Sequence, residues 1–239
     1  MRIDIHTHVL PGVDHGAKDW DTSLEMFMRS ARYGVEAIIA TPHHLPWEQN
    51  ATGKEIRELC KEAKERLLDK YSILMDIYPG NEIYYSVDTV EMLEKGEALT
   101  LAGSRYVLVE FDQEDSYQTL LKAVRDLCYN RYIPIVAQVE RYYCMHNMER
   151  LLELKEMGAL LQVNTSAFQG GLFDERSNMT KRWLKKGIVD FVASDMHDLV
   201  ERPPMSRERL QWLEKRLYPQ YQDKLLFDNA QQILHGIKA

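Results

Sequence analysis

The stretch Arg2-Ile3-Asp4-Ile5-His6-Thr7-His8 opens the chain with a short β-rich run and ends in two histidines that are two positions apart. Runs of this kind recur along the chain, and longer stretches with helical periodicity separate them. The runs that predict strands are Arg2–His6, Val35–Thr41, Ile73–Pro79, Tyr106–Phe111, Ile133–Val139, Leu160–Asn164 and Ile188–Ser194. Seven strands that alternate with helices indicate an α/β fold in which a parallel sheet closes into a (β/α) barrel.

Capping residues predict where several helices begin and end. Thr22 followed by Glu25 is the pattern of a capping box at the start of the first helix. Glycines that lead directly into predicted strands are expected to stop helices in the left-handed conformation; these are Gly34, Gly158 and Gly187. The tail from Met205 onward predicts two amphipathic helices separated near Pro219, which we expect to serve as packing elements.

Length and composition set limits on the class of protein. With 239 residues, 45% of them hydrophobic, the chain can bury one sizeable core, so we expect a single domain over residues 1–239. The net charge is -7 and the basic residues are scattered among acids, which argues against nucleic-acid binding. Three cysteines without close spacing predict reduced thiols and a cytoplasmic location. No segment is apolar enough to predict secretion or membrane insertion.

Polar side chains stand at the ends of nearly all the predicted strands. In a parallel barrel the loops that follow the strands open onto one face, where functional groups gather. A His-x-His pair leaving a strand places both imidazoles on the same side, so both can bind one metal ion. Asp195 and His197 repeat this spacing at the last strand, which lies beside the first in a closed barrel. The strand-end residues are His6, His8, His43, His44, Glu82, Glu110, Gln138, Asn164, Asp195 and His197.

The carboxylates among them favour a metal site over isolated structural roles. Glu110 lies between Val109 and Phe111, and a carboxylate in an apolar strand needs a partner or a cation. Together with Glu82, it is placed to bridge neighbouring cations, which lower the pKa of a trapped water. The remaining histidines, His146 and His235, are interpreted as loop and tail residues without a site role.

Several of these stretches, in the same order along the chain, resemble one known family. They are Asp4–Gly16, Ala40–His44, Gly80–Ile83, Val109–Phe111, Val139–Arg141, Ala193–His197 and Arg202–Pro204. The combination resembles the bacterial tyrosine-protein phosphatases of the CpsB/YwqE type, which are PHP-domain enzymes. The resemblance implies one PHP-type phosphoesterase domain, folded as a distorted (β/α)7 TIM-like barrel of the PHP superfamily. It also implies two or three divalent cations, usually Mn²⁺, with Fe, Zn or Mg as alternatives. The implied substrate is phosphotyrosine on a bacterial tyrosine kinase that controls capsule or exopolysaccharide synthesis.

The resemblance also implies a role for each site residue. His6, His8, Glu82 and Asp195 would hold a first metal, and Glu82 and Glu110 would help hold a second. His43 and His197, with Asp14 or His15, would hold a third, while Arg141 and Arg202 would clamp the phosphate.

Two positions depart from the family pattern. Gln138 stands where the family has a histidine, and an amide oxygen is a poorer ligand for a transition metal than imidazole. The Asp-Asp-Gly turn of the family reads Asp14-His15-Gly16 here, which exchanges one possible ligand for another.

The predicted mechanism is in-line attack on phosphorus by a metal-activated hydroxide, with His44 or a metal-bound water assisting the phenolate leaving group. Three alternatives stay open. One is a PHP phosphatase of a small phosphomonoester, similar to histidinol phosphatase. The second is a metal-binding regulatory protein made catalytically weak by Gln138. The third, a metallo-hydrolase of the amidohydrolase type, is disfavoured because no strand-end lysine is found in mid-chain.

Overall fold

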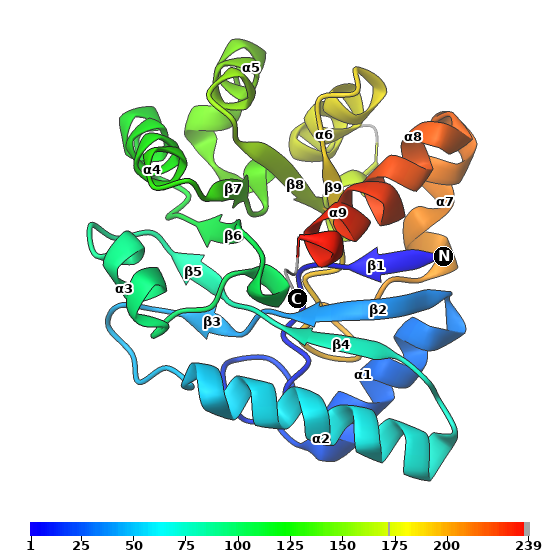
Figure 1. Ribbon diagram of the computed structural model, residues 1–239. Helices are drawn as coiled ribbons and strands as arrows, with labels where there is room; N and C mark the ends of the chain where they lie inside the picture. The colour runs from blue at the N-terminus through cyan, green and yellow to red at the C-terminus, as the bar shows by residue number, and fades with distance from the viewer. Residues whose placement is uncertain (172, 237–239) are drawn as a thin grey trace.

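The computed structural model describes residues 1–171 and 173–236 as a parallel array of short strands with helices around it (Figure 1). The strands are β1 (Arg2–Asp4), β2 (Val35–Ala40), β3 (His43–His44), β4 (Asp76–Pro79), β5 (Glu82–Tyr84), β6 (Tyr106–Glu110), β7 (Ile133–Val136), β8 (Leu160–Asn164) and β9 (Phe191–Ala193). The α-helices are α1 (Trp20–Arg32), α2 (Gly53–Tyr71), α3 (Thr89–Lys95), α4 (Tyr117–Tyr129), α5 (Met148–Glu156), α6 (Glu175–Lys185), α7 (Arg207–Arg216), α8 (Pro219–Asp223) and α9 (Asn229–His235). This confirms the predicted α/β fold with parallel strands.

The strands form two sheets that continue into each other. One sheet has the order β1-β2-β4, and the other has the order β3-β5-β6-β7-β8-β9. β2 leads into β3 and β4 leads into β5 after two residues each, and the sequence did not predict β3 or β5 because they are too short to show periodicity. An isolated parallel bridge between Thr7 and Met196 places the end of β1 beside the end of β9. The first and last strands therefore meet at the residues predicted to be functional.

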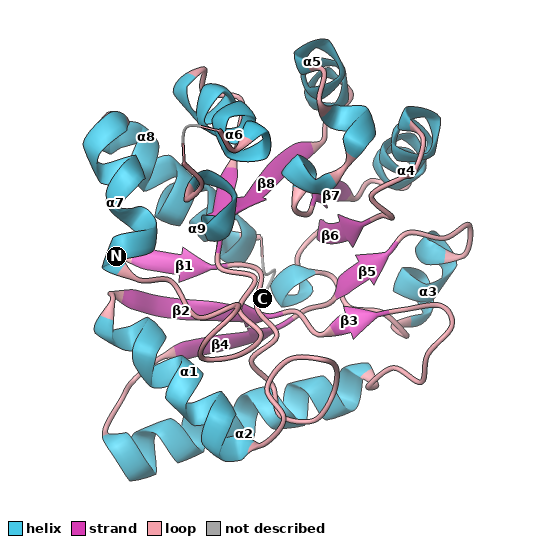
Figure 2. Ribbon diagram, turned by 180° about the vertical axis from the view of Figure 1, so that it is seen from behind, coloured by secondary structure: helices cyan, strands magenta, loops and turns pink. Residues whose placement is uncertain are grey.

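Two hydrophobic clusters lie on the two faces of the strands. The larger one fills the space between the strands and the surrounding helices, which lie on the outer side in Figure 2. The smaller one lines the inner face, where strand residues two positions apart point inward. Its members are Ile3, Ile5, Ala37, Ile39, Leu101, Ala102, Leu108, Ile135, Ala137, Phe191, Ala193, Ala230 and Ile233. Ala230 and Ile233 belong to α9, so the C-terminal helix packs against the inner face and helps to cover it.

The glycine stops predicted for the helices are confirmed, but the predicted N-cap of α1 is not. Gly34, Gly158 and Gly187 have φ angles of 77°, 105° and 70°, so the predicted left-handed stops are confirmed. The capping box at Thr22 is wrong. The carboxylate of Asp19 accepts hydrogen bonds from both N and Oγ1 of Thr22 and is the N-cap of α1, one turn before the predicted position.

The tail forms helical segments on either side of an extended link, as the sequence predicts. α7 ends before Leu217, and Pro219 begins α8 at its first turn, where a proline costs no hydrogen bond. A π-helical turn, Lys224–Asp228, then joins α8 to α9. Within the described residues, no helix is long and apolar enough to cross a bilayer.

Candidate metal centre

The inner face changes from apolar to polar at the carboxyl ends of the strands. Leu108 belongs to the inner cluster and Glu110, two residues later on the same face, is a candidate ligand. Ala193 and Asp195 repeat this arrangement at the end of β9. Because side chains on one face of a strand recur every second residue, the chain extends its hydrophobic inner face directly into a set of ligand groups.

Three overlapping groups of side chains are close enough to hold metal ions. In each group, one nitrogen or oxygen atom per residue lies within 4.8 Å of those of the other members. The groups are His6, His8, Glu82 and Asp195; His43, Glu82 and Glu110; and His8, His43 and His197. His8, His43 and Glu82 are shared between groups, so the sites adjoin one another. The structure thus brings together seven of the predicted metal-binding residues.

Unpartnered buried atoms show that this cluster fits divalent cations. Nε2 of His6 and Nε2 of His8 lie 3.2 Å apart, and Oε2 of Glu82 is 3.1 Å and 3.2 Å from them. Within the described residues, Oε2 of Glu82, Oδ1 of Asp195 and Nε2 of His197 are buried without a hydrogen-bond partner. Leaving such buried atoms without a hydrogen bond is costly, whereas one cation beside Glu82 and Asp195 and another beside His197 would satisfy them.

The outer nitrogens of the first two histidines are held by polar partners. Nδ1 of His8 lies 2.6 Å from Oδ2 of Asp14, and Nδ1 of His6 lies 3.1 Å from Oε1 of Gln162. An oxygen at Nδ1 places the proton there and leaves the lone pair of Nε2 facing the cluster. Gln162 was not singled out from the sequence; its only signal is a polar residue at an inner-face position of β8.

Charges within the cluster shift its titration strongly. Burial alone would lower the pKa of His8, but the Asp14 carboxylate, followed by Asp195 and Glu82, raises this pKa well above its ordinary value. Burial would raise the pKa of Glu82, yet His6, His8 and His43 hold it well below its usual range. Burial and the nearby charge of His8 lower the pKa of His197 to about 3. In the metal-free protein, ionised carboxylates thus keep His8 protonated. A bound cation would compete with this proton for the ring nitrogen.

Of the two candidates in the first loop, the structure brings Asp14 to the cluster and not His15. Oδ2 of Asp14 also accepts from the backbone N–H of His43 at 3.1 Å, so it joins two of the clustered histidines. His15 is 72% exposed and its Nε2 lies 3.7 Å from Oε1 of Glu48, away from the cluster. Of the two alternatives that the sequence left open, Asp14 therefore lies at the cluster and His15 does not.

Gln138 is buried against the cluster with its amide group fully engaged. Its Nε2 donates to Oε1 of Glu82 at 3.0 Å, while its Oε1 accepts from Arg141 at 2.6 Å and from Asn164 at 3.2 Å. The opposite orientation would set oxygen against the Glu82 carboxylate and NH₂ against two donors, so these partners decide which way the amide faces. The expected ligand therefore presents a donor, and not a lone pair, to the Glu82 carboxylate.

Beside the cluster lies a cavity of about 280 Å³ that four arginines line. Arg141 and Arg202 were predicted here; Arg202 donates to Oδ2 of Asp195, and Arg141 contacts Gln138. Arg176 and Arg209 also line the cavity but come from helices, where the sequence offered no strand-end signal. Two non-glycine residues at its edge, Gln138 and Asp195, have φ angles of 47° and 53°, and backbone strain of this kind is concentrated at functional sites.

His44 does not reach the cluster. It alternates with His43 along β3, so the two side chains point to opposite faces. His44 lines a separate surface pocket together with Met92, Lys95 and Glu97 of the α3 region, and burial lowers its pKa. The prediction that His44 assists the leaving group is therefore corrected, because adjacent residues of a strand cannot both face the same site.

Comparison with known proteins identifies the family. Residues 2–235 match the family described as capsular polysaccharide synthesis, CpsB/CapC. The chain belongs to the CpsB/CapC family. The tyrosine-protein phosphatase CpsB of Streptococcus pneumoniae is 33% identical to it, over 97% of this chain and 98% of that protein. The tyrosine-protein phosphatase YwqE of Bacillus subtilis (strain 168) is 32% identical, over 98% and 92%.

Solved structures agree with membership of the CpsB/CapC family. A chain from the crystal structures of YwqE from Bacillus subtilis and CpsB from Streptococcus pneumoniae, described as unique metal-dependent tyrosine phosphatases, has a TM-score of 0.89 at 31% identity. It covers 99% of this chain and 95% of the solved one. A β-aspartyl dipeptidase from Fervidobacterium islandicum AW-1 has a TM-score of 0.56 at 13% identity, with 97% and 72% covered, which is a likeness of fold alone.

Proposed function

We propose that this protein is a metal-dependent tyrosine-protein phosphatase that hydrolyses phosphotyrosine on a protein substrate. The observation that carries the proposal is the set of unpartnered buried ligand atoms on Glu82, Asp195 and His197, which adjoins an arginine-lined cavity. The CpsB and YwqE phosphatases, similar over nearly the whole chain, support it. The other two readings, a small-molecule phosphatase and a catalytically weak regulatory protein, lack comparable support.

Each candidate ligand receives a role from the groups in which it lies. His6, His8, Glu82 and Asp195 would hold one cation, and His43, Glu82 and Glu110 a second. His8, His43 and His197 face a third position, at which Asp14 acts by holding His8. When bound, such cations lower the pKa of a coordinated water and neutralise charge on phosphate. Histidine combined with carboxylate suits Mn²⁺, Fe²⁺ or Zn²⁺ better than Mg²⁺, and we propose Mn²⁺.

The chain's own groups bind and orient the phosphate. Arg141 and Arg202 both line the cavity, one from the loop after β7 and the other from the loop after β9. Guanidinium groups offer paired donors that match phosphate oxygens, so these two arginines would fix the phosphate and neutralise charge on its equatorial oxygens as the bond to the phenolate breaks. Phenolate needs little protonation to leave, because the pKa of its conjugate acid is about 10. Loss of His44 as a proton donor is therefore compatible with the reaction.

The finer structural and cellular assignments belong to the same proposal. Counting β2 with β3 and β4 with β5 as single interrupted strands, we propose a distorted (β/α)7 barrel of the PHP superfamily, in one domain over residues 1–239. A bacterial tyrosine kinase of polysaccharide synthesis is the proposed protein partner, in keeping with the family description. The three free cysteines are compatible with the proposed location in the cytoplasm.

The test is phosphate release by purified, metal-stripped protein, with and without Mn²⁺, from a phosphotyrosine peptide and from histidinol phosphate. We expect Mn²⁺-dependent release from the peptide and a much lower kcat/KM for the small phosphomonoester. A preference for histidinol phosphate would replace the proposal with the small-molecule phosphatase. Bound metal without release from either compound would support the regulatory protein.

A further inference from the structure

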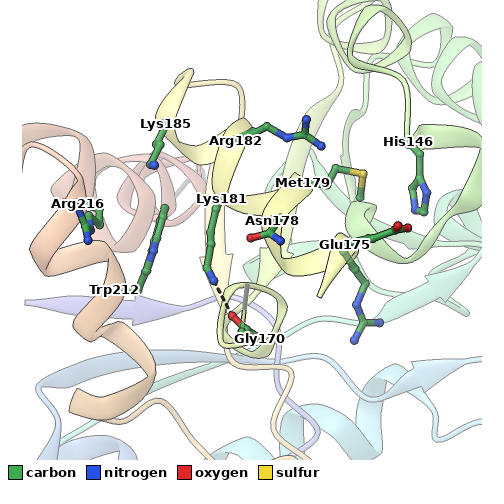
Figure 3. Close-up of a pocket in the computed structure, with 12 residues that line it drawn as sticks. His146, Gly170, Glu175, Asn178, Met179, Lys181, Arg182, Lys185, Trp212 and Arg216 are labelled. Carbon is green, nitrogen blue, oxygen red and sulfur yellow. Dashed lines mark hydrogen bonds between the residues drawn. The ribbon is translucent and has the colours of Figure 1, made fainter. Parts of the chain in front are cut away.

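A second and larger cavity, of about 960 Å³, lies between α6 and α7, beside the arginine-lined cavity (Figure 3). Its lining contains one acid, Glu175, against five basic residues: Arg176, Lys181, Arg182, Lys185 and Arg216. The whole chain has a net charge of -7, so this concentration of positive charge is a local exception. A strongly basic hollow on an acidic protein is typical of a surface that binds an anionic partner.

Among the described residues, no ion pair within 4 Å engages the basic side chains of the cavity, although the charge of Arg176 acts on Glu140 nearby. Elsewhere, helix lysines pair with acids one turn away, as Lys61 does with Glu65 and Lys95 with Glu91. Within the described residues, none of the five basic residues of the cavity forms an ion pair. On α6 the one-turn neighbour of Lys181 is Lys185, and like charges at this spacing destabilise a helix. An anion bound in the cavity would neutralise this repulsion.

The second cavity adjoins the proposed catalytic cavity through a shared residue. Arg176 lines both of them, so basic side chains continue from Arg141 and Arg202 into the space beside α6. If the phosphotyrosine of a polypeptide occupied the arginine-lined cavity, the residues next to that phosphotyrosine would therefore lie along a positively charged surface. This continuity favours the substrate chain itself as the occupant over an unrelated ligand.

The indole ring of Trp212 indicates which kind of anionic side chain the cavity would bind. Trp212 of α7 lines the cavity, and Nζ of Lys185 lies 5.9 Å from the centre of its ring. Figure 3 shows Lys185, Trp212 and Arg216 on one side of the cavity, with His146 and Glu175 on the other. Cationic groups beside an indole ring suit an anion carried on an aromatic or extended side chain, since the ring contributes apolar contact while the cations meet the charge.

We propose that the cavity between α6 and α7 binds a second negatively charged side chain of the same substrate polypeptide, a phosphotyrosine or a carboxylate, and thereby selects substrates with clustered negative charge. The inference rests on the proposed phosphatase function. It assigns a positioning role to Lys185 and Arg216, which lie outside the metal cluster and the arginine-lined cavity.

The chain offers matched variants for the test. Lys185→Glu with Arg216→Glu reverses two charges of the cavity, whereas Lys186→Glu with Lys215→Glu makes the same charge change one residue away, at exposed positions that do not line it. The substrates are peptides with one phosphotyrosine and neutral flanks, or with a second phosphotyrosine or a glutamate about two to six residues away. An extended chain advances about 3.3 Å per residue, so this series scans a range of distances.

We expect the cavity variant to lower kcat/KM about tenfold for two-anion peptides, mainly through KM, and to leave the neutral-flank peptide unchanged. The control variant should behave like the wild type. The three peptide types also distinguish the sources: a larger effect with the second phosphotyrosine assigns the cavity to phosphate, and an equal effect with glutamate assigns it to negative charge in general. Equal losses on all peptides, or equal losses in the two variants, would overturn the inference.

A binding measurement separates this inference from the phosphatase proposal. Fluorescence anisotropy with labelled peptides on metal-loaded protein reports binding whether or not hydrolysis occurs. Absent turnover on every peptide would count against the phosphatase function, while a selective loss of two-anion peptide binding in the cavity variant would still support the second site. Normal turnover without any discrimination between the peptides would reject the second site alone.

Discussion

Gly16 lies directly against His8: a Cβ atom added to Gly16 would stand 2.0 Å from the carbonyl oxygen of His8 and 2.5 Å from its Cβ. The backbone N–H of Gly16 also donates to Oδ1 of Asp14 at 2.8 Å, and the other oxygen of that carboxylate holds His8. The loop after β1 therefore depends on a residue without a side chain to bring Asp14 to the metal centre.

Gly16→Ala should displace this loop and weaken metal binding. The clash is with backbone, which cannot move aside, so we expect about 1–3 kcal/mol of destabilisation together with a loss of at least one bound metal. Metal content by elemental analysis and the melting temperature would measure both effects. Gly171→Ala is the control, because a Cβ at Gly171 meets open space. Full metal content in the Gly16 variant would contradict the role given to this loop.

Gln138→His should strengthen the site formed by His43, Glu82 and Glu110. An imidazole in place of the amide adds a ligand that transition metals prefer, and it removes the donor that now faces Glu82. We expect Mn²⁺ affinity to rise about tenfold, or about 1.4 kcal/mol. Calorimetric titration with Mn²⁺ would test this, with Gln138→Ala to separate a gained ligand from a lost hydrogen bond. Equal affinities in the two variants would show that position 138 does not approach the metal.

Arg141→Ala should lower turnover while leaving the metals in place. Arg141 lines the cavity and donates to Gln138 but belongs to none of the three ligand groups, so its loss removes a phosphate contact and one hydrogen bond to Gln138 without removing a metal ligand. We expect kcat/KM on a phosphotyrosine peptide to fall by about 100-fold or more, as happens when a donor to a charged transition state is removed. Arg141→Lys should recover part of it, and Arg125→Ala on α4 should behave like the wild type. Unchanged turnover in the alanine variant would refute the assignment.

Metal binding should release protons, and its affinity should rise with pH until His6 and His8 have lost their protons in the metal-free protein. In the metal-free protein, burial acts against charge on His6 and His8, but the neighbouring carboxylates prevail and raise both pKa values. A cation must displace these protons, so acid competes with metal. Calorimetry in buffers of different ionisation enthalpy would count the protons. Binding that is independent of pH between 6 and 8, as an order-of-magnitude window around the histidine pKa, would contradict this account.

The metal-free protein should show the opposite trend in stability. Because the pKa of His8 is higher in the folded state, its contribution is fully present below the unfolded value of about 6.5 and is lost as pH rises through the folded pKa. As pH rises, the melting temperature of the metal-free protein in chelator should therefore fall, whereas the stabilisation of the protein by added Mn²⁺ should increase. Parallel curves with and without metal would argue against ionised His8 in the metal-free state.

Much of the fold followed from local patterns. Each of the seven predicted strand segments contains a strand, and the left-handed glycines stop helices where expected. The errors occurred where a local pattern had a competitor. Asp19 accepts from the N–H of Thr22 and caps the helix three residues earlier, so Thr22 lies inside the first turn and is not its N-cap. The two-residue strand β3 carries too little periodicity to be recognised.

By itself, the sequence determined which strands carry ligand residues at their ends and which faces those residues take, because alternation along a strand depends only on backbone geometry. Tertiary structure alone decided between Asp14 and His15, set the amide of Gln138 toward Glu82, and brought Arg176 and Arg209 to the cavity. The reason is physical: the direction of a loop side chain, and the approach of a helix to a strand end, depend on packing between segments distant in the chain, and local periodicity carries no information about that packing.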